Sequence, residues 1–365
     1  MKRILVSGYF GFNNLGDEAI LNSMIQMIKE LVPDAKIIVL SNSPESTKVK
    51  YNTESIYRYD IFRIMSEMKR SEIFISGGGS LLQDVTSLRS VPYYLGLIFL
   101  ALIFEMKTIF FAQGVGPVKN KVFRFLIEKV LNRVDYLSVR DKKSKTFLEE
   151  IGIKKNKINC IDDPVFALNL SNSKLDKKVK KDDEIKNIGV SVRNWYQNSY
   201  LDSLAEFLNI LGKKNNISIT IIPFHQGKDI DISKKLQGML EVDSRLRSYT
   251  DNLDEVNNFY KKLDLFIGVR LHSLIFSAVN KIPFIGISYD PKTDSLLEEM
   301  GYQDKVTTEN VTAEKLQSSY HKIINQEEEI KEKITRIVRK KGKNVKESLA
   351  LLITDLKGEK VERKD

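Results

Sequence analysis

The chain has 365 residues, which is longer than one hydrophobic core usually supports, so its length predicts two domains. A single cysteine, Cys160, excludes an intramolecular disulfide and a metal site built from cysteines, and it fits a reducing cytoplasm. The formal net charge of +10 favours anionic partners: phosphorylated small molecules, nucleic acid or an anionic membrane surface. A lysine-rich solvated surface would account for the same charge.

The first half of the chain alternates strand-like and helix-like runs. The apolar part of the N-terminus is too short for a signal peptide and indicates a first strand. Continuous apolar strands separated by helices are typical of a parallel sheet covered on both faces. The expected strands are 3–8, 35–41, 72–79, 107–117, 135–141 and 158–164. The expected helices are 17–31, 91–104, 122–134 and 142–153.

The run Val91–Phe104 contains no charged residue. A membrane span needs roughly 20 apolar residues, so this run is too short to cross a bilayer. A buried core helix is the favoured interpretation, and an interfacial helix facing a lipid-linked substrate is the alternative.

The segment 171–187 is polar and charged, which indicates an interdomain linker. The strand–helix alternation then resumes over 188–325 and predicts a second doubly wound domain. The sequence therefore predicts an α/β protein with two Rossmann-like domains, at 1–170 and 188–325. Charged C-terminal helices follow at 326–365. Two such domains facing across a cleft form the architecture of one class of glycosyltransferases, known as GT-B.

Ligands of open parallel sheets bind at the carboxyl ends of the strands, so the candidate residues are those that follow strands. The glycines after the first strand do not have the spacing of a dinucleotide fingerprint. The later glycine turn lacks the lysine and hydroxyl residue of a P-loop. Six candidates of the first domain are Asp17, Gly78, Gly79, Asp84, Gln113 and Arg140.

In the second domain, Arg270 and His272 lie where a strand ends and a helix begins. The positive end of a helix dipole favours an anion there, and arginine adds a planar fork suited to carboxylate or phosphate. Arg193 and Lys292 follow neighbouring strands, and His225 lies near another strand end. This cationic set predicts a small ligand with two anionic groups. The competing interpretation is structural: Arg270 pairs with an acid and His272 caps its helix.

Six motifs occur in the order found in the polysaccharide pyruvyl transferase family, which the chain resembles over roughly Met1–Gly301. The motifs are GYFGFNNLGDEAIL, SGGGSLLQD, AQGVGP, SVRD, DPVF and GVRLHSLIFSA. The resemblance implies transfer of pyruvate from phosphoenolpyruvate to a sugar, with formation of a ketal and release of phosphate. It also implies phosphoenolpyruvate binding at Arg270, Leu271 and His272, with Arg140 and Lys292 contributing, and a role for Asp17 and Glu18.

The subgroup resembled acts on a lipid-linked amino-sugar saccharide of cell-wall polymer synthesis, and its product anchors surface-layer proteins. We therefore expect a cytoplasmic enzyme in peripheral contact with the inner face of the membrane. That contact would use Val91–Phe104 or the basic C-terminal helices. No metal, cofactor or nucleic-acid partner is expected. Two alternatives remain: a nucleotide-sugar glycosyltransferase of cell-surface polysaccharide synthesis, and a non-catalytic binding protein for an anionic polymer.

Overall fold

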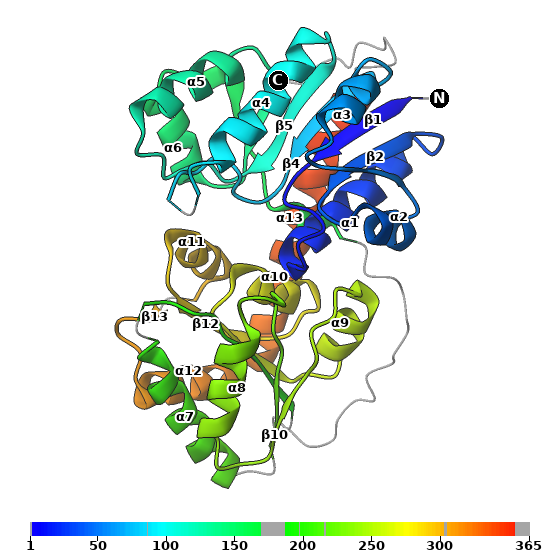
Figure 1. Cartoon of the computed structure of the whole chain (residues 1–365). Coiled ribbons are helices and arrows are strands. Elements are labelled where there is room, and N and C mark those ends of the chain that lie inside the picture. Colours follow the sequence, from blue (N-terminus) through cyan, green and yellow to red (C-terminus); the bar gives the residue numbers. More distant parts are fainter. Residues whose placement is uncertain are drawn as a thin grey trace. The chain divides into compact units, whose positions relative to one another are not determined.

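A computed structural model describes residues 2–85, 87–168, 187–196, 198–214, 217–302 and 305–354. The chain forms two compact units. Unit 1 consists of Met1–Phe12, Asp17–Asn169 and Lys341–Asp365, and unit 2 consists of Asn13–Gly16 and Leu170–Lys340. Figure 1 shows that each unit is built on one sheet with helices on both faces. The expected linker 171–187 lies outside the described residues, except for Asn187.

Unit 1 contains a parallel sheet of seven strands in the order β3-β2-β1-β4-β5-β6-β7. Its strands are β1 (Arg3–Ser7), β2 (Lys36–Ser41), β3 (Glu54–Tyr57), β4 (Ile73–Gly77), β5 (Lys107–Gln113), β6 (Tyr136–Val139) and β7 (Ile158–Cys160). Its helices are α1 (Leu15–Leu31), α2 (Pro44–Tyr51), α3 (Ile61–Met68), α4 (Ser90–Ile103), α5 (Lys121–Leu131) and α6 (Lys142–Glu150). In β1 and β4, Leu5 is aligned with Phe74, and both side chains are buried in the core.

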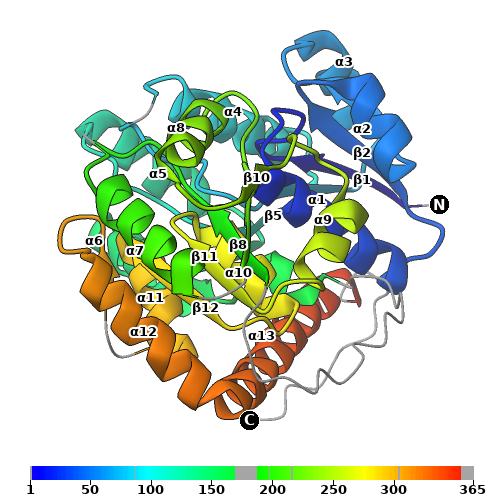
Figure 2. The same cartoon turned by 90° about the horizontal axis from the view of Figure 1, so that it is seen from below.

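Unit 2 contains a six-stranded parallel sheet in the order β10-β9-β8-β11-β12-β13. Its strands are β8 (Asn187–Ser191), β9 (Ser218–Ile221), β10 (Ser244–Leu246), β11 (Leu265–Gly268), β12 (Phe284–Ser288) and β13 (Val306–Thr307). Its helices are α7 (Tyr200–Lys214), α8 (Ile230–Met239), α9 (Leu253–Tyr260), α10 (Leu271–Val279), α11 (Pro291–Met300) and α12 (Ala313–Asn325). Figure 2 shows β8, β11 and β12 adjacent in the middle of this unit.

Local sequence explains where several helices begin. Asp60, Asn120, Asp141, Asn252 and Asp290 each accept a hydrogen bond from a backbone N–H in the first turn of their helix. Such caps satisfy backbone donors that have no partner inside the helix. The final helix, α13 (Glu327–Thr354), is continuous, with the residues before Lys341 in unit 2 and those from Lys341 onward in unit 1.

Helix α4, expected as a buried core helix, packs one face into the core and exposes apolar side chains on the other. Val91 and Ile98 lie in the core, whereas Phe99 is 42% exposed and Ile103 is 54% exposed. The helix carries no charged residue on either face. None of the helices in the described ranges combines the length and the apolar character needed to span a bilayer.

Candidate active site

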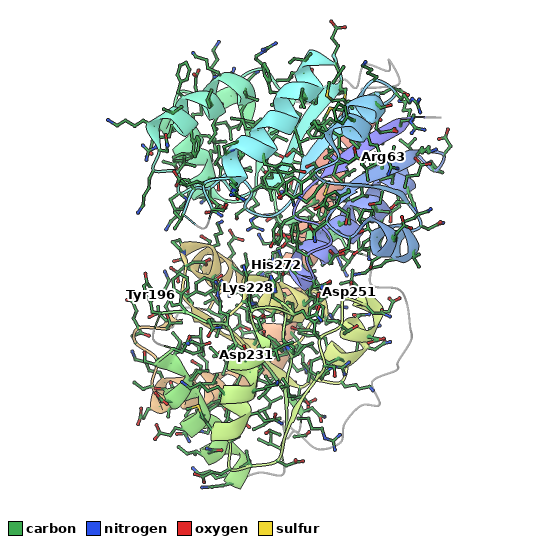
Figure 3. The ribbon with its side chains drawn as sticks, viewed as in Figure 1. Arg63, Tyr196, Lys228, Asp231, Asp251 and His272 are labelled. Atoms are coloured by element: carbon green, nitrogen blue, oxygen red, sulfur yellow. The ribbon has the colours of Figure 1, made fainter. Side chains whose placement is uncertain are left out.

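The carboxyl ends of four neighbouring strands in unit 2 bring a cationic set of residues to one edge of the sheet. His225 follows β9, Arg193 follows β8, and Arg270 follows β11. Lys292 lies in the first turn of α11, which begins where β12 ends. Figure 3 labels His272 and Lys228 at this edge of unit 2. The edge is the one where parallel sheets bind their ligands.

Arg270 forms an ion pair with Asp229, whose side chain is completely buried. The other carboxylate oxygen of Asp229 accepts hydrogen bonds from the backbone N–H groups of Phe224 (3.1 Å) and His225 (2.9 Å). Arg270 occupies the N-cap position of α10, and its side chain makes no capping hydrogen bond. Its Nε atom is buried and has no hydrogen-bond partner among the described residues. The pair therefore fixes the guanidinium, while its Nε–H group has no acceptor among the described residues.

His225 is a buried neutral donor at the same edge. Burial, followed by the charges of Lys228 and Arg270, lowers the pKa of His225 to about 4, so the ring is neutral near pH 7. The Nδ1 atom accepts a hydrogen bond from the backbone N–H of Gly227 at 3.1 Å, which places the ring proton on Nε2. That Nε2 atom is buried and has no partner within the described ranges.

Arg193 is held by aromatic rings. Its guanidinium carbon lies 4.1 Å from the ring centre of Tyr289 and 5.3 Å from that of Trp195. Cation–π contacts of this kind orient an arginine without neutralising its charge. Its Nε atom is also buried without a hydrogen-bond partner in the described part of the chain. Arg193, His225 and Arg270 thus share one property: each has a buried N–H group with no hydrogen-bond partner in the described part of the chain.

His272 is packed against Gly16 at the start of α1, in the segment Asn13–Gly16 that belongs to unit 2. A Cβ atom added at Gly16 would come within 2.4 Å of Nδ1 of His272, so only glycine allows this approach. The same segment is joined to the His225 loop, because the backbone N–H of Leu15 donates to the carbonyl of Phe224 at 2.9 Å. Gly16 therefore has a packing role beside the candidate histidine.

In unit 1, Arg140 follows β6 and is paired with a carboxylate. Its Nη1 atom lies 2.7 Å from Oδ2 of Asp163, and its Nη2 atom donates to the hydroxyl of Ser80 at 3.1 Å. Although burial by itself lowers the pKa of Arg140, the carboxylates of Asp163 and Asp141 outweigh it and raise that pKa. Asp163 and Ser80 belong to the DPVF and SGGGSLLQD motifs, so these two motifs meet at Arg140.

Asp17 lies in the first turn of α1 and faces the glycine turn after β4. Gly78 and Gly79 both have positive φ angles, of 67° and 75°. A Cβ atom at Gly79 would lie 3.0 Å from Oδ1 of Asp17, so the backbone passes close to that carboxylate. Burial, followed by the Asp17 charge, raises the pKa of Tyr9. Asp17 is therefore a buried carboxylate at the ligand edge of the unit 1 sheet.

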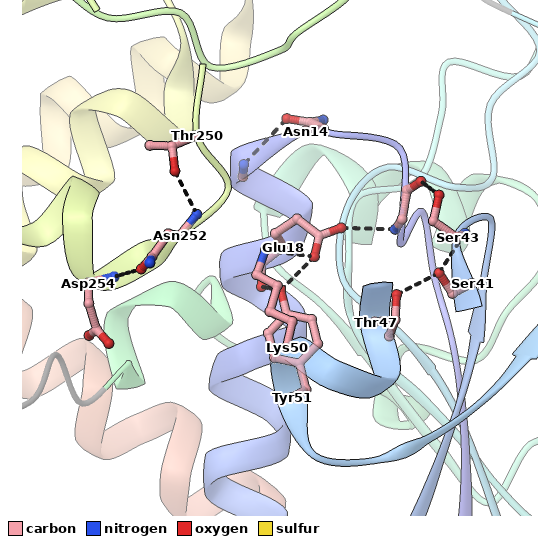
Figure 4. Close-up of polar contacts among 12 residues, drawn as sticks. Asn14, Glu18, Ser41, Ser43, Thr47, Lys50, Tyr51, Thr250, Asn252 and Asp254 are labelled. Atoms are coloured by element: carbon pink, nitrogen blue, oxygen red, sulfur yellow. Dashed lines mark hydrogen bonds and ion pairs between the residues drawn. The ribbon is translucent and has the colours of Figure 1, made fainter. Parts of the chain in front are cut away.

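Glu18 has a structural role, which Figure 4 shows. It accepts hydrogen bonds from the backbone N–H of Gly11 at 2.9 Å and from the hydroxyl of Tyr51 at 2.5 Å. Lys50 lies 3.4 Å from the same carboxylate. These contacts hold the loop after β1 against α2, so Glu18 positions the segment that carries Asp17.

Two other candidates of unit 1 also make structural contacts. The carboxylate of Asp84 accepts hydrogen bonds from the backbone N–H groups of Lys119 and Asn120, at 2.8 Å each at the shortest, and these bonds lower its pKa. Gln113 is completely buried, and its amide donates to the carbonyl and hydroxyl oxygens of Ser76. Asp84 therefore orders the loops that follow β4 and β5, and Gln113 links the ends of these two strands.

The structure brings Arg193, Arg270, Leu271, His272 and Lys292 to the edge of unit 2. Asp17, Gly78, Gly79 and Arg140 lie at the edge of unit 1. Sequence reasoning missed Asp229 and gave His225 no role, although both lie in the run HQGKD directly after a predicted strand. The described residues contain no cluster of three or more His, Cys, Asp or Glu side chains arranged to hold a metal ion.

The family model described as polysaccharide pyruvyl transferase matches residues 14–291. The chain belongs to the polysaccharide pyruvyl transferase family. The match covers the unit 1 edge with Asp17 and Arg140 as well as the unit 2 edge with Arg270 and His272. The family expected from the six motifs is thus confirmed. A comparison with curated protein sequences found no match.

This pyruvyl transferase shares its fold with sugar-nucleotide enzymes. A putative UDP-N-acetylglucosamine 2-epimerase from Listeria monocytogenes superposes with a TM-score of 0.69 at 11% identity, covering 100% of this chain and 99% of that one. The epimerase of Neisseria meningitidis bound to UDP-GlcNAc gives 0.66 at 13%, and Anabaena HepE in complex with UDP-glucose gives 0.65 at 10%. Each of these two alignments covers 97% of this chain and 100% of the related chain. The expected GT-B fold with two Rossmann-like units is confirmed.

Proposed function

We propose that this pyruvyl transferase uses phosphoenolpyruvate as donor and forms a pyruvate ketal on a sugar. The observation that carries the proposal is the edge of unit 2, where Arg193, His225 and Arg270 each have a buried N–H group without a partner among the described residues. The start of α10 adds the positive end of its dipole. Phosphoenolpyruvate has a carboxylate and a phosphate on one carbon, which suits several converging donors.

The reaction must form two C–O bonds and break one. Protonation of the methylene carbon gives an oxocarbenium-like centre, one sugar hydroxyl attacks it, and the C–O bond to phosphate breaks. A second hydroxyl then closes the ketal. The two sugar hydroxyls lose two protons. One of these balances the proton gained by the new methyl group, and the other is taken up by the released phosphate. The site therefore needs cations for the donor, an acid for carbon and a base for the hydroxyls.

We assign the acid to His272 and the base to Asp17. His272 lies in the first turn of α10 beside Arg270, and an imidazole ring can both donate and accept a proton. The buried carboxylate of Asp17 suits a hydroxyl-bearing acceptor, because its charge would repel phosphate. Arg270, Arg193 and Arg140 would bind the donor anions, with Leu271 at the helix start. In the competing assignment Lys292 is the acid and His272 only holds the phosphate.

The acceptor proposed is a lipid-linked amino-sugar saccharide of cell-wall polymer synthesis, whose pyruvylated product anchors surface-layer proteins. This part of the proposal rests on the subgroup that the motifs resemble. It implies a cytoplasmic enzyme that contacts the inner face of the membrane. No cofactor or metal is part of the proposed reaction.

The second candidate function is nucleotide-sugar-dependent glycosyl transfer. The related structures from Neisseria and Anabaena are described as bound to UDP-GlcNAc and UDP-glucose, and the unit 2 edge would also accept a diphosphate. Acceptor-dependent release of phosphate from phosphoenolpyruvate distinguishes the two functions. The pyruvyl transferase releases phosphate only when donor and acceptor are both present, and Arg270→Met removes the release. A glycosyltransferase would release UDP from a nucleotide sugar instead.

A further inference from the structure

Arg58, directly after β3 in unit 1, is a buried cation inside a cage of aromatic rings. Its side chain is 4% exposed. The guanidinium carbon lies 4.3 Å from the ring centre of Tyr93, 4.9 Å from Phe12, 5.1 Å from Tyr59 and 5.3 Å from Tyr94. One nitrogen donates to the Tyr94 hydroxyl at 3.2 Å. Four cation–π contacts position the guanidinium but leave its charge uncompensated.

Arg58 differs in this respect from two other buried arginines of the chain. Arg140 is paired with Asp163, and Arg270 is paired with Asp229. No carboxylate in the described part of the chain forms an ion pair with Arg58, and its Nε atom is buried without a hydrogen-bond partner there. Burial lowers the pKa of Arg58, but the side chains of Tyr94, Tyr93 and Tyr59 outweigh it and raise that pKa, so the cage keeps the arginine charged. An anion beside Arg58 would add the counter-charge that the cage does not supply.

A cavity of about 220 Å³ runs between α3 and α4 and has Arg58 in its wall. Its residues near the arginine are Tyr59 and Tyr93, and the wall beyond them is apolar, formed by Ile61, Leu97 and Leu100. Pockets that enclose a whole drug-sized ligand hold roughly 300–1,000 Å³. A cavity of this size suits a single hydrocarbon chain better than the two chains of a phospholipid.

The helices that border the cavity also expose apolar side chains to solvent. Phe62 at the start of α3 is 83% exposed, and Phe99 and Ile103 of α4 are half exposed. α4 carries no charged residue, and at the start of α3 the exposed Arg63 lies 4.0 Å from the carboxylate of Asp60. An apolar surface of this kind suits the boundary of a bilayer. A chain leaving the cavity would continue into such a boundary.

We infer that the cavity between α3 and α4 binds a single-chain lipid phosphate, with its phosphate at Arg58 and its hydrocarbon chain between the two helices. A phosphate supplies the counter-charge that Arg58 lacks, and the first units of the chain cover Ile61, Leu97 and Leu100. This inference deepens the proposed function and rests on it in one respect: the proposed lipid-linked acceptor is itself a lipid phosphate. It concerns binding alone and does not depend on pyruvyl transfer.

Calorimetry with farnesyl diphosphate as the probe tests the inference on the full chain without phosphoenolpyruvate. Inorganic diphosphate tests the anion alone, and farnesol tests the chain alone. The expected result is that farnesyl diphosphate binds at least tenfold more tightly than either. Short-chain phosphatidylglycerol, a two-chain phospholipid, is expected to bind at least tenfold more weakly than farnesyl diphosphate.

Two variants address the two halves of the site. Arg58→Met removes the cation and is expected to lower farnesyl diphosphate affinity at least tenfold. Gly96 lines the cavity, and a Cβ atom there would meet nothing within 4 Å, so Gly96→Phe fills the cavity without disturbing the helix. This variant is expected to lower farnesyl diphosphate affinity at least tenfold as well. Gly238→Phe is the matched control, because Gly238 is also a helical glycine with open space around it.

Equal binding of farnesyl diphosphate by wild type and Gly96→Phe would overturn the inference, whether or not Arg58→Met folds. Binding of farnesyl diphosphate no tighter than that of inorganic diphosphate would overturn it too, and so would preferential binding of phosphatidylglycerol. None of these outcomes bears on phosphate release from phosphoenolpyruvate, which tests the proposed function separately.

Discussion

The carboxylate of Asp229 joins Arg270 to the loop that carries His225. One oxygen pairs with the guanidinium, and the other accepts the backbone N–H groups of Phe224 and His225. Two strand ends of unit 2 are thereby held in a fixed relation. Asp229 therefore orders this edge of the sheet. Its negative charge would repel an anionic ligand, but the positive charge of Arg270 offsets it.

Replacing Asp229 with Asn is expected to destabilise unit 2. Removing one partner of a buried ion pair leaves an uncompensated charge, which costs roughly 3–5 kcal/mol. Urea unfolding followed by the fluorescence of Trp195, the sole tryptophan of the chain, reports on unit 2. Asp231→Asn, an exposed change on the same helix, should shift the free energy of unfolding by about 0.5 kcal/mol or less. Equal effects of the two variants would show that the pair is energetically unimportant.

Replacing Arg270 with Lys is expected to weaken donor binding while keeping the charge. Lysine lacks the planar fork, so about 1–3 kcal/mol of donor affinity should be lost, seen as a higher Michaelis constant for phosphoenolpyruvate. The same substitution at the exposed Arg63 of unit 1, Arg63→Lys, is the control and should leave the Michaelis constant unchanged. If Arg270→Lys leaves the Michaelis constant unchanged, Arg270 only supports the fold.

His225 should make unit 2 less stable in acid. Its pKa is about 4 in the folded protein and near 6.5 when unfolded, so between these values the unfolded chain binds the extra proton. Stability then falls as pH falls from about 6.5 to about 4, with a slope approaching ~1.4 kcal/mol per pH unit. Urea unfolding of His225→Gln at several pH values should show a shallower slope. The exposed His321→Gln should keep the wild-type slope, and a wild-type slope in His225→Gln would contradict the prediction.

The acid and base assignments are tested by isotope incorporation. In heavy water the product methyl group should gain one deuterium. His272→Gln should nearly abolish turnover while sparing much of the donor binding, and Asp17→Asn should abolish turnover with donor binding intact. If His272→Gln abolishes binding while Lys292→Ala binds donor but does not turn over, the acid is Lys292.

Membrane association is expected to be reversible. Flotation with anionic liposomes should recover the protein at low salt, and less of it at high salt if the basic C-terminal helices carry the contact. If the protein still floats with the liposomes at high salt, the apolar side chains of α3 and α4 carry the membrane contact. Failure to float at either salt concentration would contradict the prediction.

The fold was predictable because both sheets are buried on both faces, so their strands are continuous apolar runs. Arg193, Arg270, His272 and Lys292 were predictable as one group, because each follows a strand of the same parallel sheet. Asp229 was not predictable as the partner of Arg270, because 41 residues separate them and no periodic pattern connects them. The Arg58 cage was missed for the same reason, since its four rings come from three separate segments of the chain.

The measurement that tests the central claim most directly is mass spectrometry of a synthetic lipid-diphosphate amino-sugar disaccharide after incubation with enzyme and phosphoenolpyruvate. The account predicts that the acceptor gains the mass of one pyruvate less one water, with one phosphate released per product. Arg270→Met should give no such product, whereas the exposed Arg63→Lys should give it at the wild-type rate. An acceptor unchanged with phosphoenolpyruvate but extended by a sugar when a nucleotide sugar is supplied would contradict the account.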